Sequence, residues 1–73
     1  IVFSVYPNPT QGAITVQFAG TFNYEFAAIN GDIIFTGQAN GQEELSLDGL
    51  ASGVYFMTVK ANGNVNTVKV IKK

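Results

Sequence analysis

Apolar and polar residues alternate along most of the chain, and this alternation is the main signal of its secondary structure. In residues 13–18 the apolar side chains are Ile14, Val16 and Phe18, while Thr15 and Gln17 between them are polar. The same period recurs in residues 22–28, 44–48, 55–60 and 67–73. Successive side chains of a strand point to opposite faces, so this period, with β-branched and aromatic enrichment, predicts half-buried strands.

Turn signals separate the alternating runs. Three Asn-Gly dipeptides, Asn30-Gly31, Asn40-Gly41 and Asn62-Gly63, each lie between apolar runs. We predict a hairpin turn at each, because Asn-Gly accepts the positive φ angles of type I′ turns. Ala19-Gly20 and residues 50–53 supply two further breaks.

These signals predict an all-β fold of about seven strands in one domain, residues 1–73. The expected strands are residues 1–6, 13–19, 22–29, 32–38, 43–48, 54–61 and 65–72. Two packed antiparallel sheets need about three strands each, so we expect a β-sandwich.

Two places interrupt the alternation. Ile33, Ile34 and Phe35 are consecutive apolar residues, and Ile71 occupies a polar position of the last strand. Either both faces of these segments are covered or one face is exposed. We therefore treat them as candidate contact surfaces.

Composition excludes several functions. The chain has neither His nor Cys, which excludes thiol nucleophiles, histidine relays, disulfides and the usual zinc sites. Four Lys and no Arg stand against five acids, so the basic footprint of a nucleic-acid binder is missing. Apolar runs are too short to span a membrane. Because the chain opens at Ile1, without a signal peptide, we expect it to be one domain cut from a longer protein.

The remaining polar residues do not form a catalytic set. Glu43 and Glu44 are adjacent on an expected strand and should point to opposite faces, while Asp32 and Asp48 are isolated. The serines have no base to activate them. We expect no enzymatic activity, no metal, no cofactor and no small-molecule substrate.

The segment Tyr6-Pro7-Asn8-Pro9-Thr10-Gln11-Gly12 predicts a rigid loop between the first two strands. Each Pro fixes its own φ and biases the residue before it toward extended geometry. We expect Gly12 to take a positive φ as the next strand begins. A recognition role on top of the structural one stays open.

Residues 50–55, Leu-Ala-Ser-Gly-Val-Tyr, resemble the tyrosine corner of immunoglobulin-like sandwiches. A backbone group at this corner would accept the hydroxyl hydrogen bond of Tyr55.

The chain ends in Val68-Lys69-Val70-Ile71-Lys72-Lys73, which holds three of the four lysines. These lysines either protect an edge strand or form a handle for another protein.

Taken in this order, the signatures resemble the type A C-terminal sorting domain of the type IX (Por) secretion system of Bacteroidetes. The resemblance covers essentially the whole chain. The positions that match the family motifs are Pro7, Asn8, Pro9, Gly12, Gly31, Leu50, Gly53, Tyr55, Lys69, Val70 and Lys73. We add Lys72 as a further source of charge in the terminal strand.

The resemblance implies an immunoglobulin-like β-sandwich at the C-terminus of a secreted cargo protein. It implies transit through the periplasm and recognition by an outer-membrane translocon and its shuttle proteins. It also implies removal by a surface sortase, which joins many cargoes to anionic lipopolysaccharide.

Two other functions fit the same pattern. One is a carbohydrate-binding or adhesive module of a surface enzyme, which exposed Phe35 or Phe56 would favour. The other is a structural spacer in a multidomain protein.

Overall fold

The computed structural model describes residues 3–7 and 9–73, and within them the fold is all-β, as predicted, with no helix. The strands are β1 (Phe3–Tyr6), β2 (Ala13–Ala28), β3 (Ile33–Ser46), β4 (Gly53–Ala61) and β5 (Asn64–Lys72). All four strand pairs, β1–β2, β2–β3, β2–β4 and β4–β5, are antiparallel and form one sheet. The expected count of seven strands is therefore wrong.

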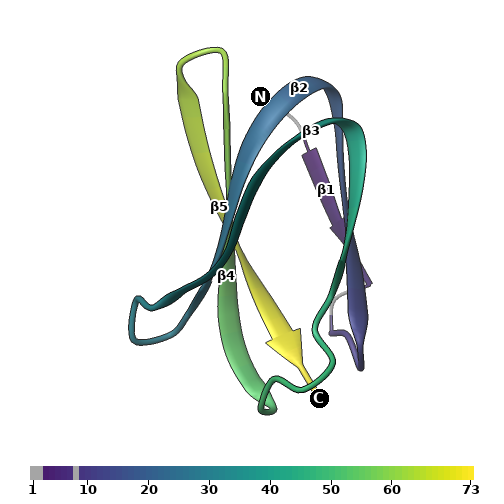
Figure 1. The fold of residues 1–73 in the computed structure, drawn as a ribbon, viewed down its shortest axis with the longest axis vertical. Helices are drawn as coiled ribbons and strands as arrows, with labels where there is room; N and C mark the ends of the chain where they lie inside the picture. The colour runs from purple at the N-terminus through teal and green to yellow at the C-terminus, as the bar shows by residue number, and fades with distance from the viewer. Residues whose placement is uncertain (1–2, 8) are drawn as a thin grey trace.

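The count differs because two of the expected breaks are bends inside long strands. The β2–β3 register runs to Gln17↔Gln42 and resumes at Thr21↔Asn40, so β2 has residues 18–20 where β3 has only Gly41. Gly20 and Gly41 have φ angles of 131° and 85°. An unequal pairing of this kind bends a strand and increases its twist, and β2 and β3 arch over together (Figure 1). The hairpin turn expected at Asn40-Gly41 is therefore wrong.

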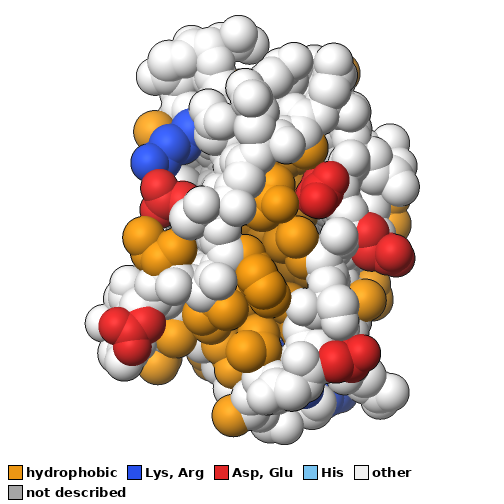
Figure 2. Space-filling model, viewed as in Figure 1, with side chains coloured by type: hydrophobic (Ala, Val, Ile, Leu, Met, Phe, Trp, Pro, Cys, Tyr) orange, Lys and Arg blue, Asp and Glu red, His pale blue; other side chains and the backbone are white. Residues whose placement is uncertain are grey.

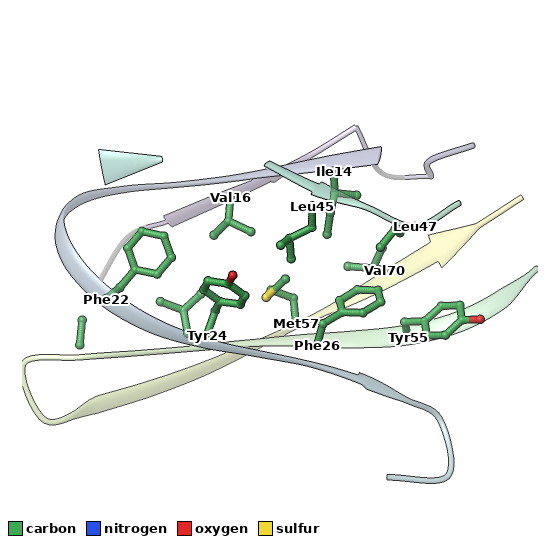
Figure 3. Close-up of a cluster of buried hydrophobic side chains, with 12 residues drawn as sticks. Ile14, Val16, Phe22, Tyr24, Phe26, Leu45, Leu47, Tyr55, Met57 and Val70 are labelled. Carbon is green, nitrogen blue, oxygen red and sulfur yellow. The ribbon is translucent and has the colours of Figure 1, made fainter. Parts of the chain in front are cut away.

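The bend folds the single sheet over its own core. The first arm holds β1, residues 13–17 of β2 and residues 42–46 of β3; the second holds residues 21–28 of β2, residues 33–40 of β3, β4 and β5. Side chains of both arms meet between them (Figure 3). The buried apolar residues are Ile14, Val16, Phe22, Tyr24, Phe26, Leu45, Leu47, Tyr55, Met57, Val59, Ala61 and Val70.

The two other Asn-Gly dipeptides do form hairpin turns. Asn62 and Gly63 have φ angles of 53° and 79° and connect the pair Ala61↔Asn64, which is the expected two-residue turn. At Asn30-Gly31 only Gly31 has a positive φ, 98°. The backbone bonds from Gly31 N to Ala28 O (2.9 Å) and from Ala28 N to Asp32 O (2.8 Å) close a three-residue loop there.

A second irregularity explains the consecutive apolar residues of β3. Phe35 pairs with Phe26 and Ile33 with Ala27, so Ile34 has no residue opposite it. Ile34 and Phe35 both pack against the core, whereas Ile33 is 56% exposed. The bulge therefore directs two neighbouring side chains inward and breaks the period of two.

The Tyr24 side chain lies next to β3 and connects the two arms. A side-chain carbon built on Gly37 would lie 2.6 Å from the Tyr24 hydroxyl oxygen, so a larger residue here would have to displace the Tyr24 ring. The hydroxyl donates a hydrogen bond to Glu43 Oε2 at 3.4 Å, across from one arm to the other. Burial, and then the Glu43 carboxylate, raise the pKa of Tyr24 above its ordinary value of 10.0.

We expect Gly41→Ala to lower the free energy of unfolding by about 1–2 kcal/mol, because an L side chain disfavours the positive φ at this bend. Nothing lies within 4 Å of the added carbon, so the loss would come from backbone conformation rather than from a clash. Urea denaturation measures it, with Gln42→Ala, at the exposed neighbouring position, as the control. Equal stability of the two variants would contradict the proposed role of the bend.

We expect the free energy of unfolding to fall as pH rises above about 10. The raised pKa of Tyr24 means that the folded chain keeps its phenol proton where the unfolded chain releases it, so alkali favours the unfolded state. Urea midpoints at about pH 8 and about pH 10.5 measure the change. Tyr24→Phe should lose less stability over this interval, and an identical loss in both proteins would refute the assignment.

Candidate recognition site at the terminal strand

The loop between β1 and β2, residues 7–12, is hydrogen-bonded to the end of β5. Thr10 N donates to Ile71 O and Lys73 N donates to Thr10 O, both at 2.8 Å. These two bonds make a parallel bridge between Thr10 and Lys72. The proline loop and the lysine-rich end, far apart in sequence, therefore form one structural unit, which we call the terminal junction: residues 7, 9–12 and 70–73.

Thr10 is the residue at the centre of the terminal junction, and the sequence analysis did not single it out. It is 1% exposed and is the one buried polar or charged residue among those the structure describes. Its hydroxyl donates to Ala13 O at 2.6 Å and accepts a bond from Gly12 N at 3.3 Å. A signal was available, since a Thr between Pro and Gly is typical of a turn closed by a side-chain-to-backbone bond.

Gly12 serves close approach rather than an unusual backbone angle. Its φ is not positive, so that expectation is wrong. Its carbonyl accepts a 2.7 Å bond from Leu47 N, and a side-chain carbon on it would lie 3.0 Å from Asp48 Oδ1. Gly12 thus ties the loop to the segment after β3.

The two prolines of the loop are exposed, and the Tyr6–Pro7 peptide is cis. Asn8, the motif residue between them, lies outside the described residues.

The β4–β5 register brings two further motifs together. Gly53 pairs with Lys72 and Tyr55 pairs with Val70. Val70 is fully buried, whereas Lys69 and Lys73 are exposed and Lys72 is half-buried. The apolar position therefore anchors β5 in the core, while the lysines bring positive charge to the surface.

The tyrosine corner forms as expected. The Tyr55 hydroxyl donates a 2.6 Å hydrogen bond to Ala51 O, and its ring stacks on Phe26 with centroids 5.3 Å apart and planes 17° apart. Leu50 packs against the core beside it. The corner fixes where β4 begins, and hence where its partner β5 ends.

Most of the loops that carry the motifs lie toward one end of the molecule. The proline loop, residues 47–52 and the C-terminus lie toward the lower end in Figure 1, while the β2–β3 hairpin projects to the left in the lower half. The opposite end holds the β4–β5 turn and the bend. The motif positions of the proline loop, of the start of β4 and of the end of β5 thus gather around the terminal junction, whereas Gly31 lies apart on the β2–β3 hairpin.

The expected contact surface at Ile33–Phe35 is only partly exposed. Ile34 and Phe35 pack on the core, while Ile33 (56% exposed) and Ile29 (69% exposed) project from the β2–β3 hairpin. The exposed apolar area here is therefore the hairpin tip. Ile71, the other candidate, is 36% exposed.

Within the part of the chain that the structure describes, no three Asp or Glu residues are grouped so as to hold a metal ion. The same residues include no helix that could cross a membrane. The exposed Lys60 Nζ pairs with Glu25 Oε1 at 2.8 Å, away from the terminal junction.

Residues 4–73 match the family model of the secretion system C-terminal sorting domain. The chain belongs to this family. It is a C-terminal sorting signal for type IX secretion, which directs proteins to the cell surface or beyond. No curated protein matches this chain in sequence.

We expect Thr10→Val to lower the free energy of unfolding of the sorting domain by about 1–3 kcal/mol, because it leaves the partly buried Ala13 O and Gly12 N without their partner. Hydrogen exchange of the Lys73 amide, which donates to Thr10 O, should accelerate as well. Thr36→Val, at an exposed position of β3, is the matched control. A Thr10→Val protein as stable as this control would show that the hydroxyl does not hold the junction.

Proposed function

We propose that the terminal junction is the surface that the type IX machinery recognises on this sorting domain. The observation that carries the proposal is the pair of backbone bonds between Thr10 and the end of β5. They place the exposed Pro9, which directly precedes Thr10, next to the end of β5 with Lys72 and Lys73. A protein that bound this corner would contact the proline loop and the C-terminal lysines at the same time.

The chemistry of the corner suits protein recognition. Prolines present a surface of fixed backbone geometry, which costs little entropy to bind. Lys69, Lys72 and Lys73 add positive charge that attracts an acidic partner surface and raises the rate of encounter. Lysines also keep an edge strand from pairing indiscriminately, so the two roles left open for them are compatible.

The partners in this proposal are the outer-membrane translocon and its shuttle proteins, reached after transit through the periplasm. A surface sortase then removes the domain and joins the cargo to anionic lipopolysaccharide. The domain itself performs no chemistry in this scheme and needs no metal or cofactor. We further propose that the folded-over sheet is a variant of the immunoglobulin-like sandwich, on the strength of its tyrosine corner.

The carbohydrate-binding alternative has less support. Phe35 and Phe56, the aromatic residues that would have to be exposed, are half-buried. Phe22, Tyr24, Phe26 and Tyr55 lie in the core. A flat aromatic platform of the kind that sugars stack on would have to form from other side chains.

The test joins the 73-residue chain to the C-terminus of a folded reporter that carries an export signal, in a bacterium with a type IX system. We expect export of the reporter to the surface or the medium. Deletion of residues 68–73 should leave the reporter in the periplasm, because it removes half of the terminal junction. A strain without the outer-membrane exporter should retain the intact fusion as well.

A second variant separates recognition from folding. Lys69→Gln combined with Lys72→Gln and Lys73→Gln removes the charge but keeps Val70 in the core, and circular dichroism checks its fold. Reduced export of this folded protein would support recognition of the terminal junction by the type IX machinery. Normal export of both the deleted and the neutral fusions would refute the proposal.

A further inference from the structure

β3 is a long edge strand whose middle lacks the usual protection against added strands. It pairs with β2 alone among the described strands, and it has 14 residues. Lysines, prolines, β-bulges and short length are devices that protect an edge, and the bulge of β3 lies near its start, at Ile34. β3 has no Lys or Pro, whereas β1 is short and β5 carries lysines.

The open part of this edge is the segment between the bulge and the bend. Residues 35–40, Phe-Thr-Gly-Gln-Ala-Asn, keep a regular register with β2 and carry no charge. Their length equals that of an ordinary strand. Alternate backbone groups of such a segment face away from β2 and are available to a further strand.

The inward side of the segment is short of side chains. Phe35, Gly37 and Ala39 are half-buried, while the intervening Thr36, Gln38 and Asn40 are exposed. Gly37 and Ala39 contribute little cover, and the Tyr24 ring lies against Gly37. Apolar surface between the arms is visible in Figure 2. An added strand would cover it with its own inward side chains.

Carboxylates flank the segment at both ends. Asp32 precedes β3, and Glu43 and Glu44 follow the bend. Figure 2 shows acidic side chains on both sides of the apolar strip. The strand at the other edge of the second arm, β5, carries lysines instead. A basic segment would therefore be attracted to β3 rather than to β5.

We propose that residues 35–40 of β3 are a docking edge for an extended segment of a partner protein, added to the sheet as a further antiparallel or parallel strand. The segment has alternating β-branched residues at its centre and Lys or Arg at both ends. Backbone hydrogen bonds supply affinity, the apolar strip selects the inward side chains, and the carboxylates select the charge. This inference does not depend on the proposed recognition by the type IX machinery, which would take place at the terminal junction.

The test uses the isotope-labelled 73-residue chain and a decapeptide, Lys-Lys-Thr-Val-Thr-Val-Thr-Val-Lys-Lys. We expect amide shifts to change in residues 35–40 and not in β5, with binding weaker at high salt. The same peptide with Glu in place of each Lys should not bind. Changes centred on β5, equal binding of both peptides, or no binding would overturn the proposal.

Gln38→Lys, at an exposed position of the segment, should weaken binding about fivefold by like-charge repulsion. Ser4→Lys, an exposed position on β1 with the same change in charge, should leave binding unchanged. Equal weakening by both variants would overturn the location. The peptide experiment on the unaltered chain stands even if Gln38→Lys fails to fold. Self-association of the chain through β3 without peptide would instead identify a second copy as the occupant.

Discussion

The bend that β2 and β3 share is the constraint on which the rest of the structure depends. A flat five-stranded sheet of this size would have no second layer to cover its apolar face. The apolar side chains of that face would stay exposed to water. Folding at Gly20 and Gly41 brings both arms over the same apolar side chains, so one sheet supplies both walls of its core. The positive φ angles at these positions explain why glycines occupy them. Tyr24 then spans the open side of the fold toward Glu43.

Closure at the other side depends on the terminal junction. β1 and β5 do not pair with one another, and the connection between the arms at this side comes from Thr10 bonding to the end of β5. The motif positions are thereby divided between two tasks. Val70, Tyr55 and Gly12 hold the corner together through burial, a hydroxyl bond and close approach. The prolines and lysines remain at the surface, where another protein can reach them.

Local signals predicted local structure well and chain path less well. The period of two located the core residues of β2 and β4, and Asn62-Gly63 and Tyr55 took the expected conformation and bond. Asn40-Gly41 has the same local preference but lies in a bend, because cross-strand pairing with β2 decides whether the chain reverses. The bulge at Ile34 likewise depends on a partner strand. The turn bonds of Thr10 have a local sequence signal, but its pairing with the end of β5 has none, because that pairing depends on a segment far away in the sequence.

The meeting of Thr10 with β5 has a kinetic consequence. It joins segments from opposite ends of the described chain, so the entropy of closing a very long loop must be overcome before those bonds form. A corner assembled in this way exists only once the intervening strands are in place. A receptor that binds this corner would bind folded molecules and not incompletely folded ones. Recognition of the corner would therefore also select for the folded state.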